Sequence, residues 1–109
     1  MVDVVDTFTM EANVGTNETT IGSVPAKRFA RFIYGIILNE QSGTVNTLTI
    51  KQYLGATLEK SWTFKIAAYD TIDIVRDINT PIFVIPGGRS IAVVAGAASV
   101  QVIMQAYDK

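Results

Sequence analysis

Three aspartates, Asp70, Asp73 and Asp77, are the carboxylates whose spacing most invites a chemical role. Two of them could act as acid and base in glycoside cleavage, and their oxygens could ligate calcium. No D-x-D-x-D-G calcium loop surrounds them, however. Because they lie in or beside a predicted strand, they are better explained as charges that keep a sheet edge from pairing with other chains.

The sequence contains no cysteine and no histidine. Disulfides, thiolate catalysis and thiolate metal sites are therefore excluded, and the commonest general base and transition-metal ligand are missing. Nothing places a lysine or a carboxylate beside a serine or threonine to act as base instead. We predict no catalytic residues, no metal site, no cofactor and no enzymatic activity.

The segment PGGRS, residues 86–90, raises the question of a phosphate-binding loop. It lacks the GxxxxGK[ST] pattern, and no helical pattern follows it. A type II turn explains it better, with Pro86 at its second position and Gly87 at its third. We therefore predict a positive φ at Gly87 or Gly88, in a turn that joins the strands FVI and SIAVVA.

Charge and hydropathy narrow the range of partners. The 9 basic and 10 acidic residues give a net charge of −1, and basic residues gather only at Lys27, Arg28 and Arg31. Nucleic-acid binding needs stronger clustering of positive charge, so no nucleic-acid partner is expected. The chain has neither a signal-peptide pattern nor about 18 consecutive apolar residues, so no membrane partner is expected. Only 17% of the residues are charged, against about 25% in average domains, which predicts a charge-poor surface.

The secondary structure predicted for the chain consists of strands. Turn signals recur about every 8–12 residues, and apolar and polar residues alternate between them, as in an antiparallel sandwich or barrel. We predict one domain over residues 1–109, with residues 1–6 as a candidate N-terminal arm. The alternation assigns these residues to the core: Phe8, Met10, Phe32, Tyr34, Leu48, Ile50, Trp62, Phe64, Ile66, Ile72, Ile74, Ile91, Val93, Val100, Val102 and Met104.

The stretch RFARFIYGIIL, residues 28–38, is the exception, because its apolar residues fit both a helix and a strand. As a strand, which its isoleucines, aromatics and Gly35 favour, it would be apolar on both faces. The second face could be covered by a loop, by the N-terminal arm or by another subunit. The scarcity of charge favours a subunit. The candidate interface consists of Phe29, Arg31, Ile33 and Ile37, together with Val75, Ile103 and Tyr107, which are apolar residues on otherwise polar strand faces.

Two segments carry a family resemblance. PIFVIPGGRSIAVVAGAASVQVIMQAYD resembles the end of small jelly-roll structural proteins of tailed viruses, in which I-P-x-G-x-S-I is followed by V-x-A-x-A-A and by a last strand with Val-x-Val and an aromatic residue. TNETTIGSVPAKRFARFIYGIILNEQSG resembles their layout of a strand, a paired strand and then Asn with a polar turn. The resemblance covers about residues 7–108 and rests on turns and sandwich geometry.

This resemblance implies an all-β fold, a jelly-roll-like antiparallel β-sandwich of about eight strands. It also implies a virion structural protein, of the head-decoration (cement) or minor capsid type. Such a protein would form a homotrimer on the capsid surface, with the major capsid protein or another virion protein as partner. Two alternatives stay open: a tail or baseplate subunit of the same fold, and a carbohydrate-binding β-sandwich that uses Tyr53, Tyr69 or Tyr107.

Overall fold

The computed structural model describes residues 7–25 and 29–109, and these residues form nine strands and no helix. The predicted arm at residues 1–6, as well as Lys27 and Arg28, lies outside the described residues. The strands are β1 (Thr7–Val14), β2 (Thr19–Ser23), β3 (Ala30–Glu40), β4 (Asn46–Leu54), β5 (Thr57–Ile66), β6 (Thr71–Val75), β7 (Phe83–Pro86), β8 (Ser90–Ala95) and β9 (Val100–Asp108).

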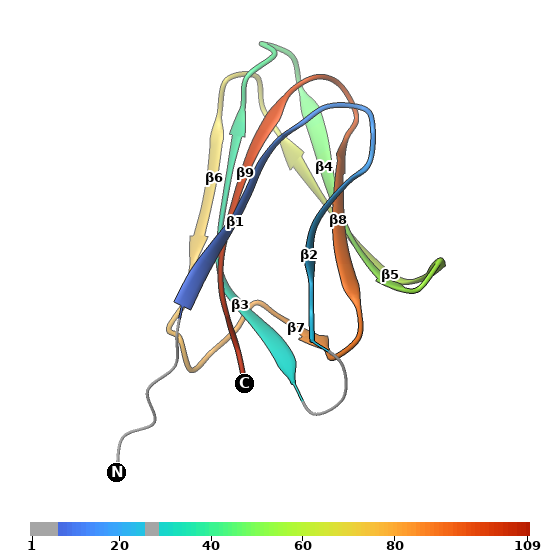
Figure 1. The fold of residues 1–109 in the computed structure, drawn as a ribbon. Helices are drawn as coiled ribbons and strands as arrows, with labels where there is room; N and C mark the ends of the chain where they lie inside the picture. The colour runs from blue at the N-terminus through green and yellow to red at the C-terminus, as the bar shows by residue number, and fades with distance from the viewer. Residues whose placement is uncertain (1–6, 26–28) are drawn as a thin grey trace.

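Two antiparallel sheets pack face to face (Figure 1). Sheet A has the order β1-β9-β3-β6, and sheet B has the order β2-β8-β4-β5. The chain pairs β1 with β9, β2 with β8, β3 with β6 and β4 with β5, so it folds as one long hairpin that is rolled over itself. This is the jelly-roll arrangement, which confirms the predicted all-β, jelly-roll-like sandwich. The strand beyond the eight of a jelly roll is the short β7. It pairs with the first half of β3, while β6 pairs with the second half.

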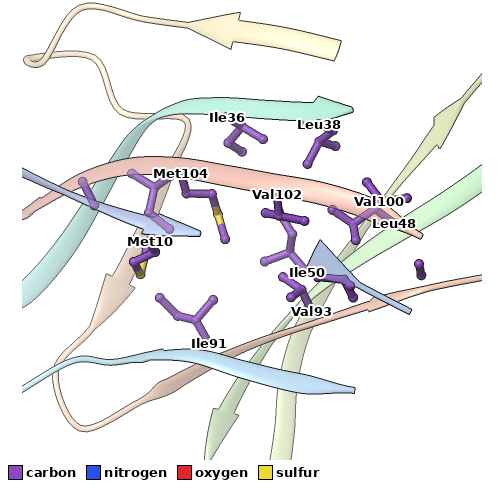
Figure 2. Close-up of a cluster of buried hydrophobic side chains, with 14 of the residues drawn as sticks. Met10, Ile36, Leu38, Leu48, Ile50, Ile91, Val93, Val100, Val102 and Met104 are labelled. Atoms are coloured by element: carbon purple, nitrogen blue, oxygen red, sulfur yellow. The ribbon is translucent and has the colours of Figure 1, made fainter. Parts of the chain in front are cut away.

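The core lies between the two sheets, where alternate residues of each strand point inward. Figure 2 shows Met10, Val102 and Met104 of sheet A pointing toward Ile50 and Val93 of sheet B. The predicted core residues that are buried are Met10, Leu48, Ile50, Ile66, Ile91, Val93, Val100, Val102 and Met104. Phe8, Trp62, Phe64 and Ile72 are partly buried and pack against this core, and Ile74 is half-buried.

The stretch that was ambiguous in the sequence is a strand, but it changes phase in the middle. In the pairing of β3 with β9, Ile33 lies opposite Ala106 and Gly35 lies opposite Gln105, so Tyr34 is the extra residue of a β-bulge. Before the bulge Ile33 faces the core, and after it Ile36 does. The prediction that Phe32 and Tyr34 are core residues is therefore wrong. The bulge shifts the inward positions to Arg31, Ile33, Ile36, Leu38 and Glu40.

The turn after Ile85 crosses the sandwich, because β7 belongs to sheet A and β8 to sheet B. Gly88 has φ 81°, as predicted for one of the two glycines, but Gly87 does not have a positive φ, so the predicted type II turn with Pro86 second and Gly87 third is wrong. The Gly88 backbone N–H donates to the carbonyl oxygens of Val24, at 3.1 Å, and Pro25, at 3.0 Å. The turn is thereby attached to the end of β2, where the two sheets approach each other.

Candidate subunit interface

The outward-facing residues of sheet A form a surface that we call the outer A face. Ile37 of β3 lies opposite Ile103 of β9, and both are half-exposed. Residues directly opposite each other in an antiparallel pair project to the same side. Since Val102 and Met104 point into the core, Ile37 and Ile103 point away from it. Two isoleucines thus meet on a face that is not covered by sheet B.

An aromatic cluster extends this surface toward the start of β3. The rings of Phe32 and Tyr107 stack with centroids 5.0 Å apart, and Tyr34 lies 6.1 Å from Tyr107. Val84 of β7 lies opposite Phe32, and Val75 of β6 lies opposite Gly35; both valines are exposed. The outer A face therefore carries apolar and aromatic side chains on four strands, with Gln105 lying over Gly35 between the aromatic cluster and the isoleucine pair.

The structure divides the seven predicted interface residues. Phe29 and Val75 are exposed, and Ile37 and Ile103 are half-buried, so the chain does not fully cover these four residues. Ile33 is 0% exposed, and the expectation that another subunit buries it is wrong, because the bulge turns it into this chain's own core. Tyr107 is also covered by its own chain: it stacks on Phe32 and donates from its hydroxyl to the carbonyl oxygen of Ile78 at 2.9 Å.

Arg31 was expected at the rim of the contact, and this expectation is wrong as well. The side chain points inward and is 7% exposed. Its Nε and Nη2 donate to the two carboxylate oxygens of Asp108 at 2.7 and 2.9 Å, and Nη2 also reaches the Ser23 carbonyl oxygen at 3.2 Å. The guanidinium lies 4.6 Å from the centroid of the Phe8 ring. Arg31 thus connects β3 to β9 in its own sheet and to β2 in the opposite sheet.

Polar groups border the apolar part of the outer A face. Asn39 donates from Nδ2 to Gln101 Oε1 at 2.8 Å and accepts at Oδ1 from the Thr71 hydroxyl at 2.6 Å. Glu11 lies opposite Ile103, and Asp73 lies opposite Ile37, so a carboxylate stands on each side of the isoleucine pair. A charge-poor apolar centre with a polar border is the composition typical of protein–protein interfaces.

Two of the three aspartates considered for chemistry, Asp70 and Asp77, have local structural roles. The Asp70 carboxylate accepts from the Thr71 backbone N–H at 2.9 Å, and the Asp77 carboxylate accepts from that of Asn79 at 3.0 Å. In the described part of the chain, no three acidic side chains come close enough together to hold a metal ion. The described residues likewise include no helix long and apolar enough to cross a membrane.

One buried carboxylate does have a strongly shifted pKa. Burial of Glu40 at the end of β3 raises its pKa, but hydrogen bonds from Asn46, Ser42 and the Gly43 N–H outweigh this and lower the pKa from 4.5 to about 2. Asn46 also donates to the Ala97 carbonyl oxygen at 2.8 Å. The network attaches the β3–β4 loop to the β8–β9 loop, which is a structural function.

Phe32, Tyr34 and Val84 belong to the outer A face, and sequence reasoning missed them there. The assignment of Phe32 and Tyr34 depends on the bulge, which reverses the inward and outward positions along β3, and Val84 of β7 lies opposite Phe32. Gly35 was the available signal, because an isolated glycine inside a strand often marks a bulge. The Gln105 side chain lies over Gly35 and would have to move to admit a β-carbon.

Comparison of the chain with protein-family models, with curated proteins and with solved structures finds no match.

Proposed function

We propose that this protein is a non-enzymatic virion structural protein that self-associates through the outer A face and reinforces a capsid from outside. The observation that carries the self-association is the uncovered apolar series of Phe32, Ile37, Val75, Val84 and Ile103. A soluble domain seldom leaves so large an apolar series in water, and such surfaces usually mark interfaces. Burying it between subunits would gain about 25 cal/mol for each Å² of apolar area removed from water.

A homotrimer on a capsid lattice is the assembly that the sequence resemblance implies. In a closed ring each copy offers the same contact surface, and several weak contacts with the lattice add up through avidity. The resemblance and the jelly-roll topology support the virion role, and the major capsid protein is the partner that follows from it. A tail or baseplate subunit of the same fold would use the outer A face in the same way.

Two equally exposed valines allow a matched test of the association. Val75 on the outer A face and Val45 before β4 are both 61% exposed. Val75→Asp should lower the oligomeric mass measured by native mass spectrometry, because it places a charge in the buried contact. Val45→Asp should leave the mass unchanged. An equal effect of the two substitutions would overturn this choice of surface.

The proposed location of the protein on a capsid is tested with whole virus particles. Gold-labelled antibody against the chain should bind the heads of virus particles isolated from cells that carry its gene. Labelling confined to the tails would support the tail alternative instead. Particles that contain none of this chain by peptide mass spectrometry would contradict a virion role altogether.

A further inference from the structure

Three loops meet at one end of the sandwich, namely those between β3 and β4, between β5 and β6 and between β8 and β9. The Glu40 N–H donates to the Asp70 carbonyl oxygen at 2.9 Å, and the Gln41 N–H donates to that of Ser99 at 3.0 Å. The loop between β5 and β6 presents Tyr69, which is 75% exposed and is the most exposed large apolar side chain in the described residues. We call this end, formed by residues 41–45, 67–70 and 96–99, the Tyr69 end.

Tyr69 is held in a backbone conformation that tyrosine rarely adopts. Its φ is 55°, and no other non-glycine residue in the described ranges has a positive φ. A left-handed backbone at a non-glycine residue costs about 1–3 kcal/mol, and such strain tends to occur at functional sites. Glycine or asparagine would adopt this conformation more easily. Stability of the turn therefore does not explain why a tyrosine stands here.

The ring of Tyr69 packs against Gly43. A β-carbon built on Gly43 would lie 2.7 Å from the tyrosine hydroxyl oxygen and 2.8 Å from Cζ, so the missing side chain leaves room for the ring. Gly43 itself has φ 80°, and its N–H donates to the Glu40 carboxylate at 2.7 Å. The aromatic ring is thus positioned against a firmly bonded loop while most of its surface faces water.

The chemistry around this ring is polar but contains no positive charge. The three segments of the Tyr69 end offer the hydroxyl groups of Ser42 and Thr44, the amide of Gln41 and the carboxylate of Asp70, and they contain no lysine or arginine. The remaining residues beside the tyrosine are mostly alanine and glycine, which leave the ring standing clear. Phosphate, sulfate and nucleic acid would need cations that these segments do not supply.

We propose that the Tyr69 end binds a neutral saccharide, with Tyr69 as the stacking platform. One face of a pyranose ring exposes C–H groups that pack on an aromatic face, and the hydroxyls at its edge need acceptors and donors such as the Asp70 carboxylate and the Gln41 amide. The aromatic ring is held in place before binding, so little conformational entropy is lost when the ligand stacks on it. This site is separate from the outer A face and does not depend on the virion role.

Affinity electrophoresis of the whole chain tests the proposal. Native gels would contain starch, galactomannan, xylan or mixed-linkage β-glucan, with dextran sulfate as the charged comparison. We expect at least one neutral polysaccharide to slow the wild-type chain, and dextran sulfate not to slow it. Tyr69→Asn keeps a residue that tolerates positive φ and removes the ring, so its apparent affinity should fall by about tenfold or more.

Two control variants make the result specific. Tyr69→Phe keeps the ring and should bind nearly as well as the wild type, whereas Leu58→Asn removes an exposed apolar side chain outside the Tyr69 end and should bind fully. The proposal is overturned if no neutral gel slows the wild-type chain, or if Tyr69→Asn is slowed as much as the wild type. It is also overturned if Tyr69→Phe loses as much affinity as Tyr69→Asn. The oligomeric mass of Tyr69→Asn should equal that of the wild type, which keeps this test distinct from that of the outer A face.

Discussion

The outer face of the five-stranded sheet A and the outer face of the four-stranded sheet B differ in chemistry. The outer B face, formed by the outward residues of sheet B, consists largely of threonine, serine and lysine. Thr49 and Thr63 hydrogen-bond to each other at 3.0 Å across β4 and β5, and Lys51 forms an ion pair with Glu18 at 2.9 Å. The hydrogen bond from Lys51 lowers the pKa of the Glu18 carboxyl, as expected for a solvated pair. This face is suited to water without any partner.

The centre of the outer A face, on β3 and β9, has aromatic rings and isoleucines, whereas its edge strands β1 and β6 present polar residues such as Thr9 and Thr71. Phe32, Tyr34 and Tyr107 form its cluster, and Ile37 lies opposite Ile103. Both sheets bury their inner faces in the same core, so the fold itself does not require an apolar outer A face. This difference is the basis of the proposal that the outer A face contacts another copy of the chain.

The largest expected effect is the difference between aspartate substitutions on the inward and outward sides of β3. Ile33→Asp should unfold the domain, because an ionised carboxylate at a fully buried position costs several kcal/mol, a large part of the ~5–15 kcal/mol that stabilises a domain. Ile37→Asp, four positions along, should stay folded and reduce the oligomeric mass. Circular dichroism and native mass spectrometry of both variants check this. If Ile33→Asp folds and only dissociates, the bulge is misplaced and Ile33 belongs to the outer A face.

A second effect concerns Arg31, which would be dispensable if it lay on the outer A face. Arg31→Met leaves the Asp108 carboxylate without its bidentate partner, and we expect a loss of about 2–3 kcal/mol in the free energy of unfolding. Arg76→Met removes an exposed arginine and should change that free energy by less than about 0.5 kcal/mol. Chemical denaturation of both variants measures the difference. Similar values would place the Arg31 side chain in water.

A pH-dependent measurement tests whether Glu40, at the end of β3, also faces inward. The pKa of Glu40 is lowered from 4.5 to about 2 in the folded chain, so its ionised form contributes stability above pH 4.5. This contribution should be lost as the pH falls from 4.5 toward 2, because the unfolded chain binds the proton first. Glu40→Gln should show a shallower decline over that window in urea denaturation. An identical slope in the two proteins would mean that the Glu40 carboxylate has lost its hydrogen bonds.

The smallest effect is expected on the outer B face. Thr63→Val removes one exposed hydroxyl–hydroxyl hydrogen bond and keeps a β-branched side chain, so the free energy of unfolding should change by less than about 0.5 kcal/mol. The oligomeric mass should not change. A lowered mass would show that the outer B face also takes part in association and would weaken the contrast between the two faces.

The inward-facing residues of a strand could be predicted from the sequence where its other side meets water. In β4 and β5 the alternation of Leu48, Ile50 and Trp62 with threonine and lysine predicted the inward residues correctly. The Pro-Gly-Gly sequence predicted a positive φ at one of two glycines, and Gly88 has it. In these segments every second residue is polar, and the polar residues identify which side of the strand faces water.

The phase of β3 could not be read in the same way. When both faces are apolar, a shift by one residue changes nothing in the pattern, so Ile33 and Phe32 could exchange roles without any visible signal except Gly35. Arg31 shows a second limit, because its inward guanidinium pairs with the Asp108 carboxylate, 77 residues further along the chain. Tyr69 shows a third, because aromatic residues seldom adopt the left-handed backbone conformation.

The mass of the wild-type chain in solution tests the central claim most directly. Native mass spectrometry at micromolar concentration should give a multiple of the 11.8 kDa chain mass, with the trimer as the expected species. The multiple should disappear in Val75→Asp and persist in Val45→Asp. A wild-type chain that stays at 11.8 kDa over this concentration range would contradict the account, because the outer A face would then remain in water.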